Sequence, residues 1–141
     1  MFSKACSYAL RACLYLAVHA SESSKIGVKS LAAELNVPVH FLGKILQDLA
    51  RQGLISSVKG PQGGFFLSAK NLDQPLARVV VSVDGPAVFT SCVLGFDECG
   101  SANPCSLHNQ VFAYREGLKR QMEESTIGEM AARVKRKGGK I

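Results

Sequence analysis

Three cysteines and one histidine lie close together in the C-terminal half of the chain. Cys92, Cys99, Cys105 and His108 are separated by six, five and two residues. Thiolates and imidazole are the ligands that hold zinc and iron–sulfur centres in proteins. By spacing alone zinc is the leading candidate, because structural zinc sites of three cysteines and one histidine are common. A redox-active thiol pair, or loop cysteines without a shared role, are the alternatives.

The residues around these ligands suggest how they meet. Asn103-Pro104 has the sequence of a helix cap followed by a first helical residue, which predicts a helix that starts at residue 104. Cys105 then lies in the first turn, where free backbone amides favour a thiolate. His108 follows on the same helical face. The other two thiols come from a preceding glycine-containing loop that can fold back, so we expect the four ligands to converge.

The predicted helix over residues 104–124 carries an apolar seam. Its apolar residues recur in alternating steps of four and three, which is typical of helices that pair with one another. We expect this seam to form the interface of a homodimer through Leu107, Val111, Tyr114 and Leu118. A capping box at Thr126 and Glu129 predicts a short last helix. The basic segment 135–141 is expected to be a flexible tail.

The N-terminal half predicts a helix-turn-helix followed by a wing. Apolar residues at three- and four-residue steps indicate a helix over residues 2–20. The turn Asn36-Val37-Pro38 joins two further helices, about 29–36 and 38–51. Strand-like segments then flank the turn sequence KGPQGG, which indicates a β-hairpin. A helix is also predicted over residues 73–83, although its β-branched residues weaken the helical propensity.

The third predicted helix has a face suited to DNA. Four apolar residues form its buried stripe: Leu42, Ile45, Leu46 and Leu49. The opposite face is polar, and the wing tip carries a lysine and small residues. A solvated helix face is the alternative, but the neighbouring turn and wing favour DNA binding. The candidate DNA-binding residues are Ser30, His40, Lys44, Gln47, Arg51, Lys59, Gly60 and Pro61.

Charge and composition agree with a DNA-binding protein, and an enzyme is ranked far below that function. The chain carries a net charge of +6, and residues 1–70 hold eight basic and three acidic side chains. Most of the positive charge therefore lies in the N-terminal half, where a DNA-binding surface is predicted. The sequence has no long apolar run and no signal-peptide pattern, so we expect a cytoplasmic protein without a membrane partner. Five cysteines, an odd number, favour reduced thiols over disulfides. The sequence shows no nucleophile–base pair, phosphate loop or paired-carboxylate motif of the kind that would indicate an enzyme or a small-molecule substrate.

Several motifs together resemble one known family. The segments LISSVKGPQGGFFLS and SVDGP and the three-cysteine loop are similar to the Rrf-type family of bacterial transcriptional regulators, which includes the IscR and NsrR repressors. The resemblance covers about residues 1–134. It implies a homodimer that binds palindromic promoter DNA. It also implies that the loop cysteines hold an iron–sulfur cluster, 2Fe–2S or 4Fe–4S, and so raises that cluster above zinc.

The resemblance also assigns ligands residue by residue. Cys92, Cys99 and Cys105 match the family's thiolate ligands, and His108 matches the histidine of IscR-like 2Fe–2S members. Members with a carboxylate ligand need an acid near position 8, whereas this chain has no acid before Glu22. His108 is therefore the expected fourth ligand, and 2Fe–2S is favoured over 4Fe–4S.

The sequence thus predicts a mainly α-helical fold with a small β-hairpin wing. We expect a winged helix-turn-helix over residues 1–84, a cluster-binding loop over 85–108, and a dimerisation helix with a short last helix over 104–134. The predicted function is transcriptional regulation in which the cluster controls promoter binding in response to iron–sulfur status, redox state or nitric oxide. The alternative is a zinc-stabilised or cluster-free, thiol-based regulator of the same fold.

Overall fold

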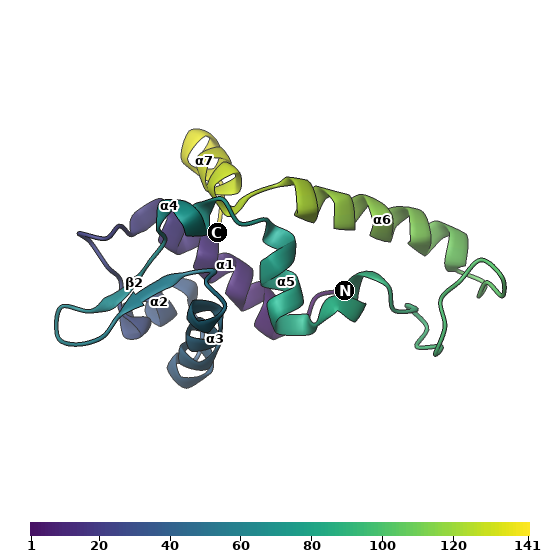
Figure 1. Cartoon of the computed structure of the whole chain (residues 1–141), viewed down its shortest axis with the longest axis horizontal. Coiled ribbons are helices and arrows are strands. Elements are labelled where there is room, and N and C mark those ends of the chain that lie inside the picture. Colours follow the sequence, from purple (N-terminus) through teal and green to yellow (C-terminus); the bar gives the residue numbers. More distant parts are fainter.

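A computed structural model describes all 141 residues. It shows a mainly helical chain with one two-stranded antiparallel hairpin, as predicted. Most of the elements pack together, and we call this part of the molecule the head. One helix, α6 (His108–Glu124), extends away from the head toward a long loop (Figure 1). None of the helices is long and apolar enough to cross a membrane. In chain order the elements are α1 (Lys4–His19), α2 (Val28–Leu35), α3 (Val39–Arg51), β1 (Ser56–Val58), β2 (Gly64–Phe66), α4 (Ala69–Leu72), α5 (Leu76–Asp84), η1 (Pro86–Phe89), α6 (His108–Glu124) and α7 (Ile127–Lys137).

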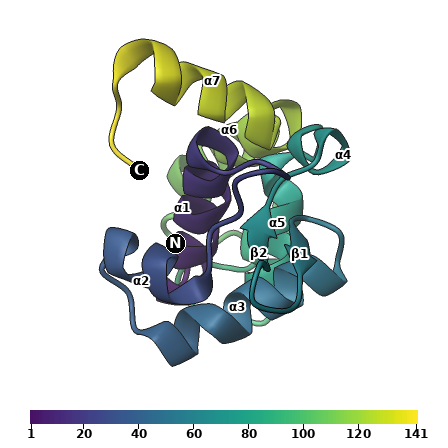
Figure 2. The ribbon, with the colours of Figure 1, turned by 90° about the vertical axis from the view of Figure 1, so that its left-hand side faces the viewer.

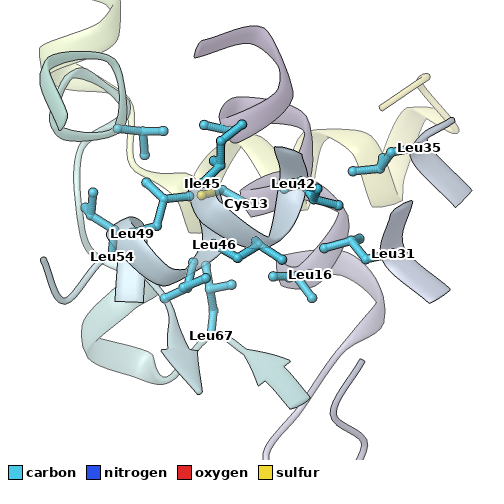
Figure 3. Close-up of a cluster of buried hydrophobic side chains, with 14 of the residues drawn as sticks. Cys13, Leu16, Leu31, Leu35, Leu42, Ile45, Leu46, Leu49, Leu54 and Leu67 are labelled. Atoms are coloured by element: carbon cyan, nitrogen blue, oxygen red, sulfur yellow. The ribbon is translucent and has the colours of Figure 1, made fainter. Parts of the chain in front are cut away.

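The core of the head forms where α3 packs against α1 and α2. The predicted stripe on α3 is buried, and Figure 3 shows its side chains meeting Leu16 and Cys13 of α1 and Leu31 of α2. Each fully buried leucine contributes about 1.5–3 kcal/mol to folding. Cys6 and Cys13 are both fully buried, and each belongs to a buried apolar cluster.

The turn between α2 and α3 fixes the helix-turn-helix. Asn36 adopts a left-handed conformation with φ 54°, which asparagine tolerates better than most residues. The next amide, that of Val37, donates to the carbonyl of Ala32 at 2.9 Å, and the Val37 side chain is buried. Helix α3 begins at Val39, with Pro38 as its cap. The predicted turn is therefore confirmed, with α3 starting one residue later.

The wing is a short hairpin that is held to the head at its base. Ser56 pairs with Phe66 and Val58 with Gly64. At the tip Gly63 is required, because a Cβ there would lie 2.1 Å from the carbonyl oxygen of Val58. Phe65 exchanges two backbone hydrogen bonds with Ile26, at 2.8 and 3.0 Å. The wing is thus anchored to the connection between α1 and α2.

Asn71 of α4 also supports the wing, and the sequence did not single it out. Its side chain is buried and donates to the carbonyl of Gly53 at 2.8 Å. Its amide oxygen accepts from the hydroxyl of Ser56 at 2.7 Å. Because Gly53 ends the turn after α3 and Ser56 begins β1, this one side chain ties the wing to α3.

The predicted helix over residues 73–83 is wrong in its bounds. Helix α4 ends at Leu72, residues 73–75 are not helical, and α5 begins only at Leu76. Pro75 disfavours helical backbone in the residue before it, and it serves as the cap of α5. At the far end of α5, Asp84 accepts hydrogen bonds from the backbone amide and hydroxyl of Ser3, the cap of α1.

The predicted start of the long helix at Asn103-Pro104 is also wrong. Helix α6 begins at His108, and its cap, Leu107, makes no side-chain capping bond. Asn103 makes no capping hydrogen bond to a backbone amide, and residues 103–107 form bends and turns rather than helix. Instead the amide of His108 donates to the carbonyl of Cys105 at 3.0 Å, forming a turn ahead of the helix.

Helix α7 closes the head. It lies on the opposite side of α1 from α3 (Figures 1 and 2), and its first residue, Ile127, is fully buried in the main core. The predicted capping box is present: Glu129 donates its amide to the Thr126 hydroxyl at 3.1 Å and accepts from the Thr126 amide at 3.0 Å. The helix continues to Lys137 and ends at Gly138, so the first three residues of the predicted flexible tail are helical.

Candidate metal centre and DNA-binding surface

The loop between η1 and α6 forms an open cavity of about 430 Å³. All four predicted ligands line it, three from the loop and one from the first residue of α6. The remaining lining residues are an aromatic ring, two acids and the Asn-Pro pair. The complete lining is Cys92, Phe96, Asp97, Glu98, Cys99, Asn103, Pro104, Cys105 and His108.

Within this cavity the ligands approach one another without forming a closed ligand set. The sulfur of Cys99 lies 3.5 Å from Nδ1 of His108. Cys92 and Cys105 line the same cavity beside them. No group of three of these side chains is arranged as ligands of one ion. The predicted residues are therefore brought together in one cavity.

Cys92 lies in surroundings that favour its thiolate. The backbone amides of Phe96 and Leu94 donate hydrogen bonds to its sulfur, and these bonds lower the pKa of Cys92 from its ordinary value. Contacts with the other two loop thiols act in the same direction, while burial opposes them. The sequence analysis expected the start of a helix to stabilise a thiolate at Cys105, but Cys105 lies ahead of α6, so that expectation is not met. Instead, the loop turn over residues 92–96 favours the thiolate of Cys92.

Arg115 of α6 is part of this site, and the sequence analysis missed it. Its guanidinium is buried, and Nη1 donates to the carbonyl of Ser91 at 2.8 Å and to the sulfur of Cys99 at 3.5 Å. The ring of Phe112 stacks on His108 at 5.6 Å between centroids, and the Arg115 guanidinium lies 5.8 Å from the centroid of the same ring. The spacing of His108, Phe112 and Arg115 along one helical face was the available signal.

Alkylation of the reduced, metal-free protein is expected to separate two classes of thiol. Burial raises the pKa of Cys6 and of Cys13 to about 12, so both remain uncharged thiols at neutral pH. The three loop thiols line an open cavity, and the pKa of Cys92 is lowered. Peptide mass spectrometry after brief iodoacetamide treatment should find label on the loop and none on the two core thiols. Comparable labelling of Cys13 in the folded protein would contradict this assignment.

The polar face of α3 and the wing form one continuous surface. His40, Lys44, Gln47 and Arg51 are exposed on α3, as predicted. A groove of about 710 Å³ runs between this helix and the hairpin, and Gln47, Arg51, Lys59 and Gly60 all line it. Pro61 is exposed at the wing tip and Ser30 on α2. In Figure 2, α2, α3 and the hairpin lie together on the side of the head away from α7.

Two exposed apolar residues at the start of α3 were not predicted. Val39 and Phe41 are 39% and 44% exposed, and Phe41 makes an edge contact with Tyr8 of α1. Recognition helices contact bases with their N-terminal residues, where an apolar side chain can meet a thymine methyl group. The apolar side chains therefore extend the candidate surface rather than interrupt it.

The predicted dimer seam on α6 is not covered within one chain. Leu107 and Tyr114 are 43% and 62% exposed, while Val111 and Leu118 are half-buried. None of the four belongs to either buried apolar cluster of the head. Each of the first three stands one position before His108, Phe112 or Arg115, so the seam and the loop-facing stripe are neighbouring faces of one helix.

The chain matches the family described as Rrf2, iron-dependent transcriptional regulator, over residues 2–133. The chain belongs to the Rrf2 family. Rrf2-family proteins are DNA-binding transcriptional regulators with a helix-turn-helix, which agrees with the surface formed by α3 and the wing.

Curated relatives support this assignment. A putative HTH-type transcriptional regulator of Aquifex aeolicus is 34% identical over 127 residues, which is 88% of this chain and 83% of the relative. The HTH-type transcriptional regulator IscR of Vibrio atlanticus is 27% identical over 87% of this chain and 70% of its own length.

Solved structures share the fold of this Rrf2-family protein. CymR, described as the global cysteine regulator of B. subtilis, superposes with a TM-score of 0.73 at 23% identity, covering 94% of this chain and 97% of that one. IscR of T. potens gives a TM-score of 0.70 at 20% identity, covering 100% of this chain and 93% of that one. At these identities the likeness supports the winged-helix architecture alone.

Proposed function

We propose that this Rrf2-family regulator binds promoter DNA as a homodimer under the control of an iron–sulfur cluster, held by Cys92, Cys99, Cys105 and His108. The observation that carries the proposal is that these four side chains line a single cavity at the start of α6. Three soft thiolates with one imidazole are a donor set suited to iron–sulfur ligation, with 2Fe–2S preferred over 4Fe–4S. The IscR relatives support the same reading.

The residues of the cavity fit such a group. The backbone amides that donate to Cys92 are the kind of hydrogen bonds that tune thiolate-ligated clusters. Arg115 adds a buried positive charge in contact with Cys99. When bound, the cluster would supply a redox-active centre whose charge depends on its oxidation state. Cys92, Cys99 and Cys105 would hold it from the loop, and His108 from α6.

The control of DNA binding follows from the neighbouring faces of α6. The stripe of His108, Phe112 and Arg115 meets the loop, and the seam beginning at Leu107 is turned toward a second copy of the chain. A rearranged loop would shift the packing of α6 in the dimer and thereby change the spacing of the two recognition helices. Cluster state then biases a two-state dimer between arrangements that fit and do not fit the promoter.

On the DNA side, Lys44, Gln47, Arg51 and Lys59 would make the principal contacts. Lys59 at the wing tip is placed for phosphate or the minor groove, and Gln47 lies in the groove beside α3 where a base edge would enter. Arg51 is paired with Asp48 at 3.3 Å, but both are exposed, so this pair contributes little to stability and leaves Arg51 available to DNA. Ser30, His40, Gly60 and Pro61 border the same surface.

Alanine substitution should separate the phosphate-contacting residues from the base-contacting residue. Lys44→Ala and Lys59→Ala are expected to weaken binding to all sequences and to reduce the slope of log affinity against log salt by about one each. Gln47→Ala should instead change the preferred sequence, at a cost of about 1–3 kcal/mol at the affected base pair. Fluorescence anisotropy at several salt concentrations measures both effects. Wild-type affinity and slope in all three variants would show that this surface is wrongly assigned.

A second candidate function is thiol-based regulation without a cluster. The specific observation is that the free thiols of Cys92, Cys99 and Cys105 line one cavity, and that the pKa of Cys92 is lowered. Such thiols are suited to oxidation into a disulfide. Bound zinc in the same cavity is a further variant of this function.

Promoter binding by protein prepared without oxygen tests the proposal against this alternative. We expect the reconstituted iron–sulfur form and the metal-free, reduced form to differ in affinity for a family-type promoter. Mild oxidation of the metal-free form should add no comparable change. If loaded and metal-free protein bind identically while disulfide formation switches affinity, the thiol-based function is correct.

A further inference from the structure

Arg115 presents a buried charge without an opposite charge. Its side chain is 5% exposed, and its Nε is buried with no hydrogen-bond partner. It takes part in no ion pair; the salt bridge of this chain is the one between Arg51 and Asp48. Removing a guanidinium from water without a compensating charge is costly to folding.

The neighbours of Arg115 do not by themselves compensate it. A neutral carbonyl at Ser91 and the face of Phe112 give partial stabilisation. The remaining contact is the sulfur of Cys99, 3.5 Å from Nη1. That sulfur is neutral in a thiol and anionic in a thiolate ligand, so the balance of charge depends on the state of the cavity.

The charge of a filled cavity would match Arg115. Three thiolates carry one more negative charge than a dipositive ion carries positive charge, and a neutral imidazole ligand adds no charge. One guanidinium supplies the missing positive charge, and a hydrogen bond from it to a ligand sulfur is the kind of outer contact that tunes metal affinity and reduction potential.

We propose that Arg115 is the counter-ion of an anionic, thiolate-ligated centre, and that it hydrogen-bonds the sulfur of Cys99 in that centre. This rests on the proposed function in that the cavity must hold such a centre. Arg115 acts through Cys99 as a positioning residue and is not itself a ligand. Because it lies on α6 one position after Tyr114 of the dimer seam, it also links the charge of the centre to the helix that would transmit it.

The test compares Arg115→Met, which removes the charge while keeping an apolar chain, with Arg115→Lys, which keeps the charge. Arg120→Met, on an exposed position of the same helix, is the control. Zinc binding by the reduced, metal-free proteins, measured by chelator competition, should be about 10- to 100-fold weaker in Arg115→Met. Arg115→Lys should recover most of that loss, and Arg120→Met should match the wild type.

The Tm of the metal-free proteins distinguishes a counter-ion from a purely structural residue, because loss of a structural residue would lower the Tm. Replacing an unpaired buried charge by an apolar side chain should leave the Tm unchanged or raise it. In reconstituted cluster protein, the reduction potential of Arg115→Met should be lower than that of the wild type, since a nearby positive charge favours the reduced form. A lower metal-free Tm together with unchanged zinc affinity would overturn the proposal and make Arg115 a support for the Ser91 carbonyl.

The outcomes separate this inference from the cluster itself. If the wild type binds zinc but takes up no iron and sulfide, the cluster-dependent function fails. The zinc and unfolding measurements still decide whether Arg115 is the counter-ion of a thiolate-ligated centre. If the wild type binds neither, both proposals fail together.

Discussion

A Leu118→Glu variant is expected to be monomeric at micromolar concentrations at which the wild type is a dimer. Leu118 is half-buried within one chain and belongs to the seam that begins at the exposed Leu107. In a symmetric dimer the substitution places two carboxylates in an apolar interface with no partner. That costs about 3 kcal/mol or more, which weakens dimerisation by at least about 100-fold.

Sedimentation equilibrium measures this effect directly. Ala113→Glu is the matched control, because Ala113 is exposed on α6 away from the seam and gains the same charge. It should remain a dimer. Promoter affinity should fall with dimerisation in Leu118→Glu, because a monomer reaches only one half-site. A wild type that is monomeric at micromolar concentration would rule out the seam as a dimer interface.

Replacing any one of the three loop cysteines by alanine should remove most of the iron from protein purified without oxygen. Each substitution deletes a thiolate from a cavity that offers three, and alanine has no atom to take its place. His108→Ala should behave differently. It is expected to keep a cluster with a shifted visible spectrum and potential, because one neutral ligand is exchanged for another.

Cys6→Ala provides the control for these variants. Cys6 is fully buried in the smaller apolar cluster beside α5 and does not line the cavity. It should retain the iron content of the wild type, whatever it loses in stability through a small core cavity. Full iron in all three loop variants would contradict the ligand assignment.

The head of the molecule was predictable because its signals are local. The period of apolar residues on α3 fixes which side is buried, and Leu42, Ile45 and Leu46 lie there. The glycine-rich segment after Lys59 specified a tight hairpin, and Asn36-Val37-Pro38 specified the turn between α2 and α3. In each case a short stretch of sequence is enough to determine the backbone.

The site was less predictable because it depends on contacts between distant segments. Asn103-Pro104 carries a helix-start signal, yet the helix begins at His108, where the loop turn ends. Asn71 and Arg115 are polar residues that local patterns place on the surface. Their burial depends on the carbonyl of Gly53 in one case and that of Ser91 in the other, both far along the chain.

The central claim, an iron–sulfur cluster bound by the loop and α6, is tested most directly by the metal content of protein purified without oxygen. Iron, acid-labile sulfide and zinc are measured on the same sample as its visible spectrum. We expect about two iron and two sulfide ions per subunit, with the colour of a 2Fe–2S centre. Colourless protein that carries one zinc ion per subunit and no acid-labile sulfide would contradict it.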